Sequence, residues 1–278
     1  MRKIIVILLC AIILVRCGQS DKCQTVITDD LITEELLRSD VIDTSTVFNV
    51  PVVFHVLYEN ESENIDKSLI LGALETLKRD FLAINEDINL VPKRFQNNIG
   101  SPKISFYLAD DLPNEAIIRK PTKIKTYDFK KRTAFRQSKI YNPSKYLNVY
   151  ICDLNTSAVT PTGQSLRNNS FDNGIVIDYK KVFPGSRTIT HEVGHFFSLY
   201  HTFEGKCRNK DRVADTPAQK KHFNCPSQKY ECRNHTMFMN FMGYNSCRYF
   251  FTKGQVTRMR KYISKYKSYT NPVNPPEL

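Results

Sequence analysis

The sequence predicts a mixed α/β fold of the α+β class: a twisted, mostly parallel sheet with one central helix, followed by a smaller loop-rich C-terminal part that ends in a helix. Three observations lead to this prediction. Strand-like apolar runs recur before residue 180, and an amphipathic helical pattern follows the first of them. The region after residue 201 is loop-rich, carries cysteines and closes with a second helical pattern.

Residues 1–17 resemble an export signal. Arg2 and Lys3 precede the apolar run 4–15, which is shorter than the ~20 residues of a membrane-spanning helix. Cys17 ends the signal as in bacterial lipoproteins, where this cysteine is lipidated, but Arg16 stands where a small residue is expected. Lipid anchoring at the cell surface or in the periplasm and simple secretion therefore both remain open. Either route exports the protein.

Residues 18–46 are polar and acidic, so we expect a pro-segment or linker there. The ordered domain is predicted over 47–271, with an N-terminal part 47–201, a C-terminal part 202–271 and a tail 272–278. The chain has 278 residues, 41% of them hydrophobic, which is enough for one such domain with an ample core.

Four strands are expected at 50–58, 104–108, 147–152 and, after an Asn173-Gly174 turn, 175–179. The first is apolar on both faces, which is typical of a buried parallel strand. It contains His55, for which we expect a hydrogen-bonded structural role.

Three helices are expected. The first has the four-residue repeat Ile65, Leu69, Ala73, Leu77 and Phe81, and Asn64 or Asp66 can cap its start. The central helix is predicted to begin near Ser186 or Thr188, either of which can cap it, and to end near Ser198. The last helix, 252–267, has the apolar stripe Val256, Met259, Ile263 and Tyr266.

The central helix carries a metal-ligand pattern. His191 and His195 are four residues apart, so a helix places both imidazoles on one face. Glu192 can then approach a metal-bound water without being a ligand, and His201 supplies a third imidazole. Three histidines with one open position are typical of a catalytic Zn²⁺ site.

Such a short motif also arises by chance on surface helices. Here, apolar residues interleave with the ligands, as a buried helix requires, and Met242 downstream is a candidate Met-turn residue. The motif chemistry assigns Glu192 as the general base. Tyr244 is either a donor to the oxyanion or a core aromatic residue. Met242 is expected to form an apolar floor beneath the histidines.

The net charge is +12, basic residues crowd 119–139, and no acidic residue occurs from 232 to 276. Such runs are commonly solvated, but they also attract acidic substrates or anionic surfaces. No nucleic-acid motif stands out. Four late cysteines lack a C-x-x-C pair, so two disulfides are expected rather than a structural zinc. Cys152, inside a strand, is expected to be a buried thiol.

Several segments together resemble the pappalysin (cytophagalysin) family of metzincin metallopeptidases. The resemblance is dense over 187–260 and extends weakly to 51–56. The segments that carry it are HEVGH at 191–195, LYHTF at 199–203, DTP at 215–217, NFMGY at 240–244 and FTKGQVTRM at 251–259.

The resemblance implies zinc bound by the three histidines, endopeptidase activity with Glu192 as base, and the crossed disulfides Cys207–Cys232 and Cys225–Cys247. Some relatives bind calcium after the third histidine; Asp211 and Asp215 are candidate ligands, with capping or solvent roles as the alternative. Some zymogens block zinc with a pro-segment cysteine. Cys23 can do this, or remain a spare thiol, or pair with Cys152.

Two departures from the family pattern matter. Ser198 stands where metzincins have glycine, and a turn with positive φ there costs serine on the order of 1 kcal/mol or more. Relatives that cleave before basic residues carry a carboxylate shortly before the last cysteine. The segment 244–247 has no carboxylate, so a preference for Arg or Lys after the scissile bond is not inferred for this protein.

The sequence therefore predicts an exported, monomeric zinc endopeptidase acting on proteins or peptides. The alternative is a catalytically weak or inactive relative that binds host or matrix components, for which Ser198 is the only argument. A lipid-anchored protein with structural zinc is disfavoured by the open fourth position.

Overall fold

The computed structural model describes residues 45–109, 115–122, 137–154, 163–166, 174–225 and 230–269. The predicted export signal with Cys17, residues 18–44 of the predicted pro-segment with Cys23, most of the basic stretch 119–139 and the C-terminal tail lie outside these residues. No helix among the described residues is both long and apolar enough to cross a membrane.

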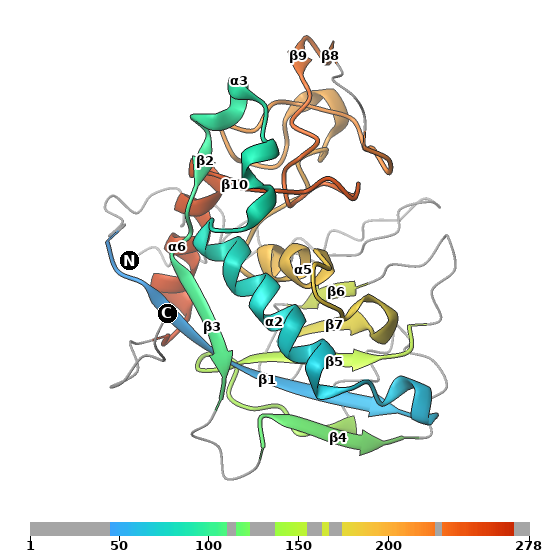
Figure 1. Ribbon diagram of the computed structural model, residues 1–278. Helices are drawn as coiled ribbons and strands as arrows, with labels where there is room; N and C mark the ends of the chain where they lie inside the picture. The colour runs from blue at the N-terminus through green and yellow to red at the C-terminus, as the bar shows by residue number, and fades with distance from the viewer. Residues whose placement is uncertain are drawn as a thin grey trace, which may run out of the picture.

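A six-stranded sheet forms one layer of the molecule (Figure 1). Its central strand β1 (Phe48–Tyr58) pairs in parallel with β5 (Leu147–Cys152) on one side. On its other side, residues 48–52 of β1 pair with β3 (Ile104–Leu108), and residues 54–58 pair with β4 (Ile117–Pro121). Both pairings are parallel.

The sheet continues from β5 to β7 (Gly174–Asp178), which is parallel, and ends with β6 (Gly163–Leu166), which is antiparallel to β7. The predicted, mostly parallel sheet is confirmed. The short strands β4 and β6 were not predicted, because their segments IIRKP and GQSL lack the apolar pattern of a buried strand.

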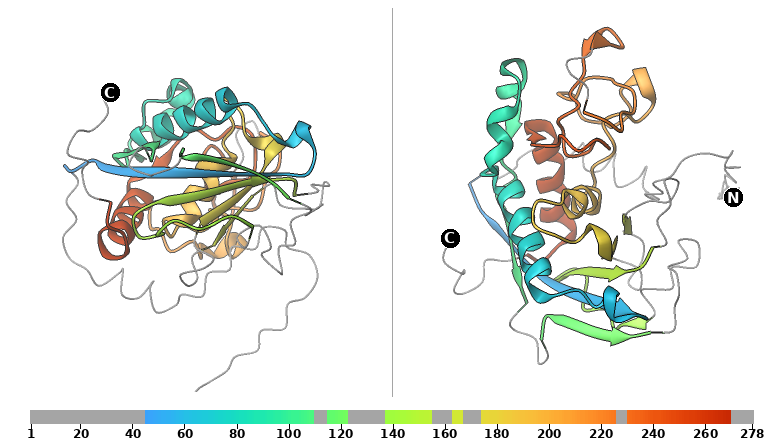
Figure 2. Two further views of the ribbon diagram at one scale, coloured as in Figure 1. Left: turned by 90° about the horizontal axis from the view of Figure 1, so that it is seen from below. Right: turned by 45° about the vertical axis from the view of Figure 1, so that its right-hand side comes forward.

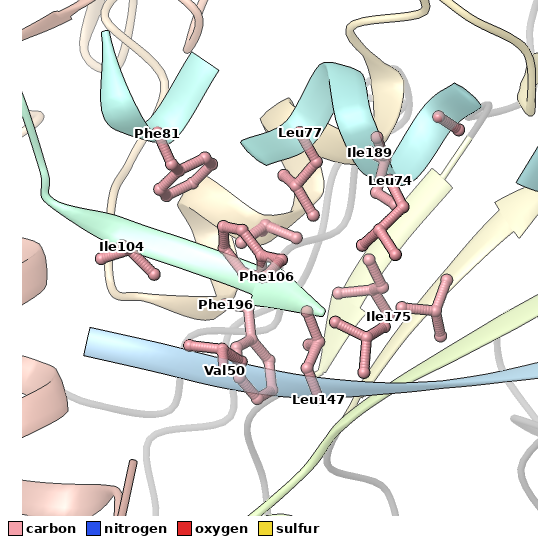
Figure 3. Packing of buried hydrophobic residues seen from close by; sticks show 14 of the residues in the cluster. Val50, Leu74, Leu77, Phe81, Ile104, Phe106, Leu147, Ile175, Ile189 and Phe196 are labelled. Atoms are coloured by element: carbon pink, nitrogen blue, oxygen red, sulfur yellow. The ribbon is translucent and has the colours of Figure 1, made fainter. Parts of the chain in front are cut away.

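The two faces of the sheet follow the period of two along each strand. In β1, Val50, Val52, Phe54 and Val56 are fully buried and belong to the main core, together with residues of α2 (Lys67–Leu82) and α5 (Thr188–Phe196). Both helices lie on the same side of the sheet (Figure 2). Figure 3 shows Leu74, Leu77 and Phe81 of α2 pointing into this core.

The opposite face of β1 carries His55. Its Nε2 donates to Asn148 Oδ1 at 3.1 Å, so Nδ1 accepts from Ser138 Oγ at 2.7 Å. The ring stacks on Tyr150 with centroids 4.3 Å apart. Burial lowers the pKa of His55 to about 4, although the Asn148 hydrogen bond raises it, and the imidazole is therefore neutral. The predicted structural role of His55 is confirmed.

The starts of the first two helices agree with the prediction only in part. Asp66 occupies the N-cap of α2, but its side chain makes no capping hydrogen bond. The N-cap of α5 is Arg187, so neither Ser186 nor Thr188 caps this helix. Tertiary contacts replace the cap, because Arg187 Nη1 lies 3.1 Å from Asp80 Oδ1 and Nη2 lies 2.9 Å from Asp87 Oδ1.

The remaining elements build the other part of the molecule. These are α3 (Lys93–Gln96), β8 (Tyr230–Glu231), β9 (Asn234–His235), α6 (Lys253–Tyr266), and the antiparallel pair β2 (Ile99–Gly100) and β10 (Phe251–Thr252). Short 3-10 helices occur at Glu61–Glu63, Glu86–Leu90, Tyr179–Lys181 and Lys206–Arg208. The β2–β10 pair and α3 bring residues 93–100 into this part.

The predicted final helix is confirmed. Thr252 caps α6 in a capping box with Gln255. Asp215 reinforces the cap, since its carboxylate accepts from Thr252 Oγ1 at 2.6 Å and from Gly254 N at 2.9 Å.

Replacing Phe81 with alanine tests the main core. Phe81 is fully buried, and its ring contacts Phe106 and Phe251 at centroid distances of 5.1 and 4.9 Å. Phe81→Ala should lower the free energy of unfolding by about 3–5 kcal/mol. Leu71→Ala on the exposed side of α2 is the control and should stay within about 0.5 kcal/mol of the parent. Equal losses in urea unfolding would contradict this packing.

Candidate metal centre

The three predicted histidine ligands converge on one point. His191 and His195 lie one turn apart on α5, and the chain then turns back so that His201 faces them. His195 Nε2 lies 3.1 Å from His191 Nε2 and 3.0 Å from His201 Nε2. Within the described part of the chain, no other group of three His, Cys, Asp or Glu side chains brings its ligand atoms so close together.

Hydrogen bonds to backbone carbonyls fix two of the imidazoles. His191 Nδ1 donates to Phe241 O and His195 Nδ1 donates to Leu199 O, both at 2.8 Å. With the proton on Nδ1, the Nε2 atoms of His191 and His195 are both bare acceptors, so the short contact between them is not a hydrogen bond. Acceptors crowd in this way around a cation. The nitrogens of a tetrahedral zinc site are about 3.3 Å apart, which the cluster matches closely.

Burial keeps the imidazoles of His191 and His201 neutral. Burial is the first cause that lowers the pKa of His191 well below its ordinary value, and the neighbouring histidines add to it. Burial also lowers the pKa of His201 to about 3, with a further contribution from the Lys221 charge. A metal ion therefore meets lone pairs rather than protons at physiological pH.

Glu192 is 3% exposed, and its Oε2 has no hydrogen-bond partner among the described residues. Burial raises its pKa to about 8, while the charge of Arg248 acts in the opposite direction. An orphaned carboxylate oxygen beside the histidines fits a site built for a metal and its water molecule.

Met242 packs directly beneath the metal-ligand helix. A Cβ atom at Gly194 would lie 2.5 Å from Met242 Sδ, so glycine permits the contact. Asn240 shapes the turn, since its Oδ1 accepts from Met242 N at 2.9 Å and its Nδ2 donates to Gln255 Oε1 at 2.7 Å. Met242 thus lies against α5, and its expected role as an apolar floor beneath the histidines stays a prediction.

Tyr244 lies beside the ligands. Its ring centroid is 4.8 Å from that of His201 and 5.7 Å from that of His191. The ring of Phe203 stacks on that of His201, with centroids 4.7 Å apart. This places the Tyr244 side chain at the metal centre, whereas its role as an oxyanion donor stays a prediction.

Ser198 makes the turn that returns His201, with φ of 79°. This is the left-handed region, which serine adopts at a cost of about 1–2 kcal/mol. Arg258 of α6 offsets part of this strain, because its Nε donates to Ser198 O at 2.6 Å and its Nη2 to Ser198 Oγ at 3.1 Å. Sequence reasoning missed Arg258, since no local pattern links residues sixty positions apart.

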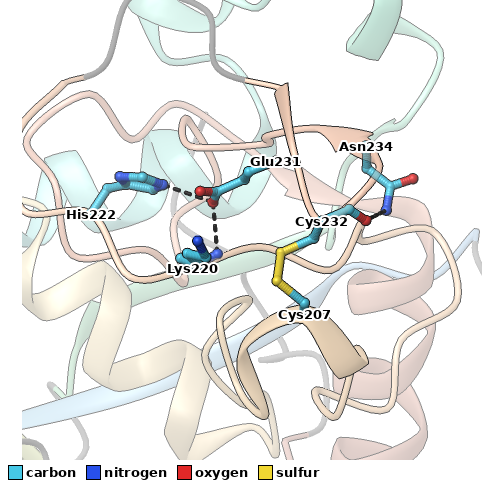
Figure 4. The surroundings of a disulfide bond; sticks show 6 residues. All are labelled: Cys207, Lys220, His222, Glu231, Cys232 and Asn234. Atoms are coloured by element: carbon cyan, nitrogen blue, oxygen red, sulfur yellow. Dashed lines mark hydrogen bonds and ion pairs between the residues drawn. A yellow bond between two sulfur atoms is a disulfide. The ribbon is translucent and has the colours of Figure 1, made fainter.

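The structure joins Cys207 to Cys232 and Cys225 to Cys247. Near the first disulfide, Glu231 Oε1 accepts from Lys220 N at 2.7 Å and from His222 Nε2 at 2.8 Å (Figure 4). Cys152 is a buried free thiol, as predicted, and burial raises its pKa.

The candidate calcium ligands both bind protein donors. Asp211 accepts from Thr216 Oγ1 at 2.5 Å and from Val213 N at 3.2 Å, and Asp215 caps α6 as described above. These are the capping roles that the sequence left open. Calcium binding here stays a prediction.

Comparisons with known proteins agree with this geometry. The sequence profile of peptidase family M43, described as pregnancy-associated plasma protein-A, matches residues 130–264. Mature mirolysin of Tannerella forsythia, solved with a cleaved peptide, is 31% identical, with a TM-score of 0.74 over 82% of this chain and 100% of its own. Promirolysin of the same organism is also 31% identical, with a TM-score of 0.72 over 80% of this chain and 82% of its own.

Curated relatives include fungal extracellular metalloproteases. That of Sordaria macrospora is 41% identical over 113 residues, 38% of each chain. That of Arthroderma benhamiae is 28% identical over 254 residues, 83% of this chain and 78% of its own. The alignments span 38%, 32% and 50% of the length of the Sordaria, Colletotrichum graminicola and Neurospora crassa proteins.

Ser198 offers a test of the turn. Ser198→Ala keeps the strained φ and loses the hydroxyl that Arg258 binds, so the free energy of unfolding should fall by about 1.5–3 kcal/mol. Ser198→Gly loses the same bond but relieves about 1–2 kcal/mol of backbone strain, so it should cost clearly less. Chemical denaturation of both variants measures the difference. Alanine as stable as glycine would contradict the account.

Proposed function

Because the chain belongs to the M43 (pappalysin) family of metallopeptidases, we propose that it is an exported zinc endopeptidase that hydrolyses peptide bonds in proteins or peptides. One observation carries the proposal. Three buried imidazoles bring their Nε2 atoms together beside Glu192, whose Oε2 has no hydrogen-bond partner among the described residues. This donor set fits zinc, for which nitrogen ligands and an open fourth position are typical of catalysis.

Zinc bound by His191, His195 and His201 would lower the pKa of a water molecule toward ~7 and polarise a substrate carbonyl. Glu192 accepts the proton of the attacking water at Oε2 and passes it to the leaving amine. Its pKa, raised to about 8 by burial, suits a group that both takes and gives a proton near neutral pH. In this proposal Tyr244 donates a hydrogen bond to the developing oxyanion.

Names of relatives support other parts of the proposal. The fungal relatives are called extracellular, which supports export. The mirolysin complex with a cleaved peptide supports a peptide substrate. Promirolysin supports a pro-form in which 18–46 precedes the mature domain. In this proposal Cys23 blocks the metal in the pro-form. Lipidation at Cys17 and simple secretion remain two routes, and a monomer is the proposed state.

The alternative is a catalytically weak or inactive binding protein, and it rests on Ser198. The structure supports the enzyme instead, because Ser198 adopts the left-handed turn and the three imidazoles still converge.

Glu192→Gln separates metal binding from catalysis. The purified variant should retain about one zinc per chain, since the ligands are unchanged, and lose about 10²–10⁴-fold in cleavage of a denatured protein. Chelation should abolish the cleavage by the parent. The control is Glu75→Gln, an exposed carboxylate of α2, which should keep parental activity. Chelator-insensitive cleavage, or full activity of Glu192→Gln, would refute the proposed mechanism.

A further inference from the structure

Two buried arginines lie two residues apart on α6, and each donates hydrogen bonds to another part of the chain. Arg258 is 5% exposed, and its Nε donates to Ser198 O at 2.6 Å while its Nη2 donates to Ser198 Oγ at 3.1 Å. Arg260 is 1% exposed, and it donates to Pro102 O and Thr46 O, both at 2.9 Å. Of the two, Arg258 binds the turn that leads to the third proposed metal ligand.

The turn at Ser198 connects two proposed metal ligands. Ser198 N donates to His195 O at 2.9 Å, which closes the turn onto the end of α5. The carbonyl of Leu199 accepts from His195 Nδ1 at 2.8 Å, and His201 follows two residues later. The peptide unit between Ser198 and Leu199 therefore joins the carbonyl that Arg258 binds to the residue that orients the His195 ring.

Arg258 supports this turn at two places. Besides binding Ser198, its guanidinium carbon lies 5.1 Å from the ring centroid of Tyr200, the residue before His201. Leu199, between the two, is fully buried in the main core. The backbone is strained at Ser198, whose φ is 79°. Because a strained backbone persists only when its surroundings hold it, loss of Arg258 should let the turn relax and displace both imidazoles.

Arg258 is itself fixed by α6 and by its surroundings. The capping box of Thr252 and Gln255 closes the start of the helix, and the next residue, Met259, is fully buried in the main core. Burial raises the pKa of Asp211 to about 6, and the charge of Arg258 is one of the influences that lower it. The buried guanidinium therefore interacts with a carboxylate, as a charge in the interior requires.

We propose that Arg258 is a positioning residue that sets the zinc affinity of the site by holding the segment between His195 and His201. In this role Arg258 acts through the two ligands and does not bind the metal itself. Residues that orient metal ligands typically contribute about 10–100-fold to metal affinity. The inference rests on the zinc site of the proposed function, but not on peptidase activity.

The zinc dissociation constant, measured by competition with a chromogenic chelator, tests the proposal. Arg258→Met keeps an unbranched side chain and removes the donors, so it should weaken zinc binding about 10–100-fold. Arg258→Lys keeps the charge and one donor group, so it should lose less. Chemical denaturation of the metal-free proteins checks that each variant is folded under the conditions of the titration.

Arg260→Met is the matched control, because it removes the same chemical group from the same helix and likewise leaves carbonyl acceptors without their donor. It should lower the free energy of unfolding, as Arg258→Met does, but leave the zinc affinity close to that of the parent. An equal loss of zinc affinity in the two variants would indicate a general loosening of the fold and would overturn the proposal.

Ser198→Gly gives a second measurement on the same turn. Glycine adopts a φ of 79° without strain, so the turn should depend less on outside support. Arg258→Met should therefore cost less zinc affinity in the Ser198→Gly protein than in the parent. The same cost in both backgrounds would contradict a role of Arg258 through this turn.

Zinc binding separates this inference from the proposed peptidase function. If the parent binds zinc but cleaves no peptide, the peptidase function fails while the zinc affinities still judge Arg258. A zinc affinity of Arg258→Met equal to that of the parent overturns the inference alone. A parent that binds no zinc overturns both.

Discussion

Two hydrogen bonds from imidazole Nδ1 atoms to backbone carbonyls determine the geometry of the metal centre. One joins His191 to Phe241 O, and the other joins His195 to Leu199 O. They fix the tautomers, so that both Nε2 atoms present lone pairs to the same point, and they fix the ring orientations. Since Phe241 lies fifty residues from His191, the metal centre exists only when the two parts of the chain have assembled.

The carbonyl of Phe241 is held in turn by a buried network. Phe241 N donates to Phe250 O at 3.0 Å, and Asn240 and Gln255 exchange two side-chain hydrogen bonds at 2.7 and 3.0 Å. Gln255 also closes the capping box of α6, which connects the turn under the metal to that helix. Buried polar networks with satisfied partners are rigid, so the ligand geometry is largely set before a metal or substrate binds.

Periodic patterns predicted the long strands, the helices and the pairing of His191 with His195, because burial and helix geometry act locally along the sequence. The short strands β4 and β6 were not predicted, since their pairing depends on other parts of the chain. The predicted cap of α5 was wrong for the same reason: Arg187 anchors α5 through Asp80 and Asp87 instead of a local Ser or Thr. Arg258 holds the turn at Ser198 through long-range hydrogen bonds that no local motif encodes.

X-ray absorption at the zinc edge of the purified protein tests the central claim most directly. Convergence of the three imidazoles predicts one zinc per chain with three nitrogen ligands at about 2.0–2.1 Å and one further ligand. His201→Ala should remove one nitrogen from this shell. A parent spectrum with fewer than three nitrogen ligands, or a shell unchanged by His201→Ala, would contradict the account.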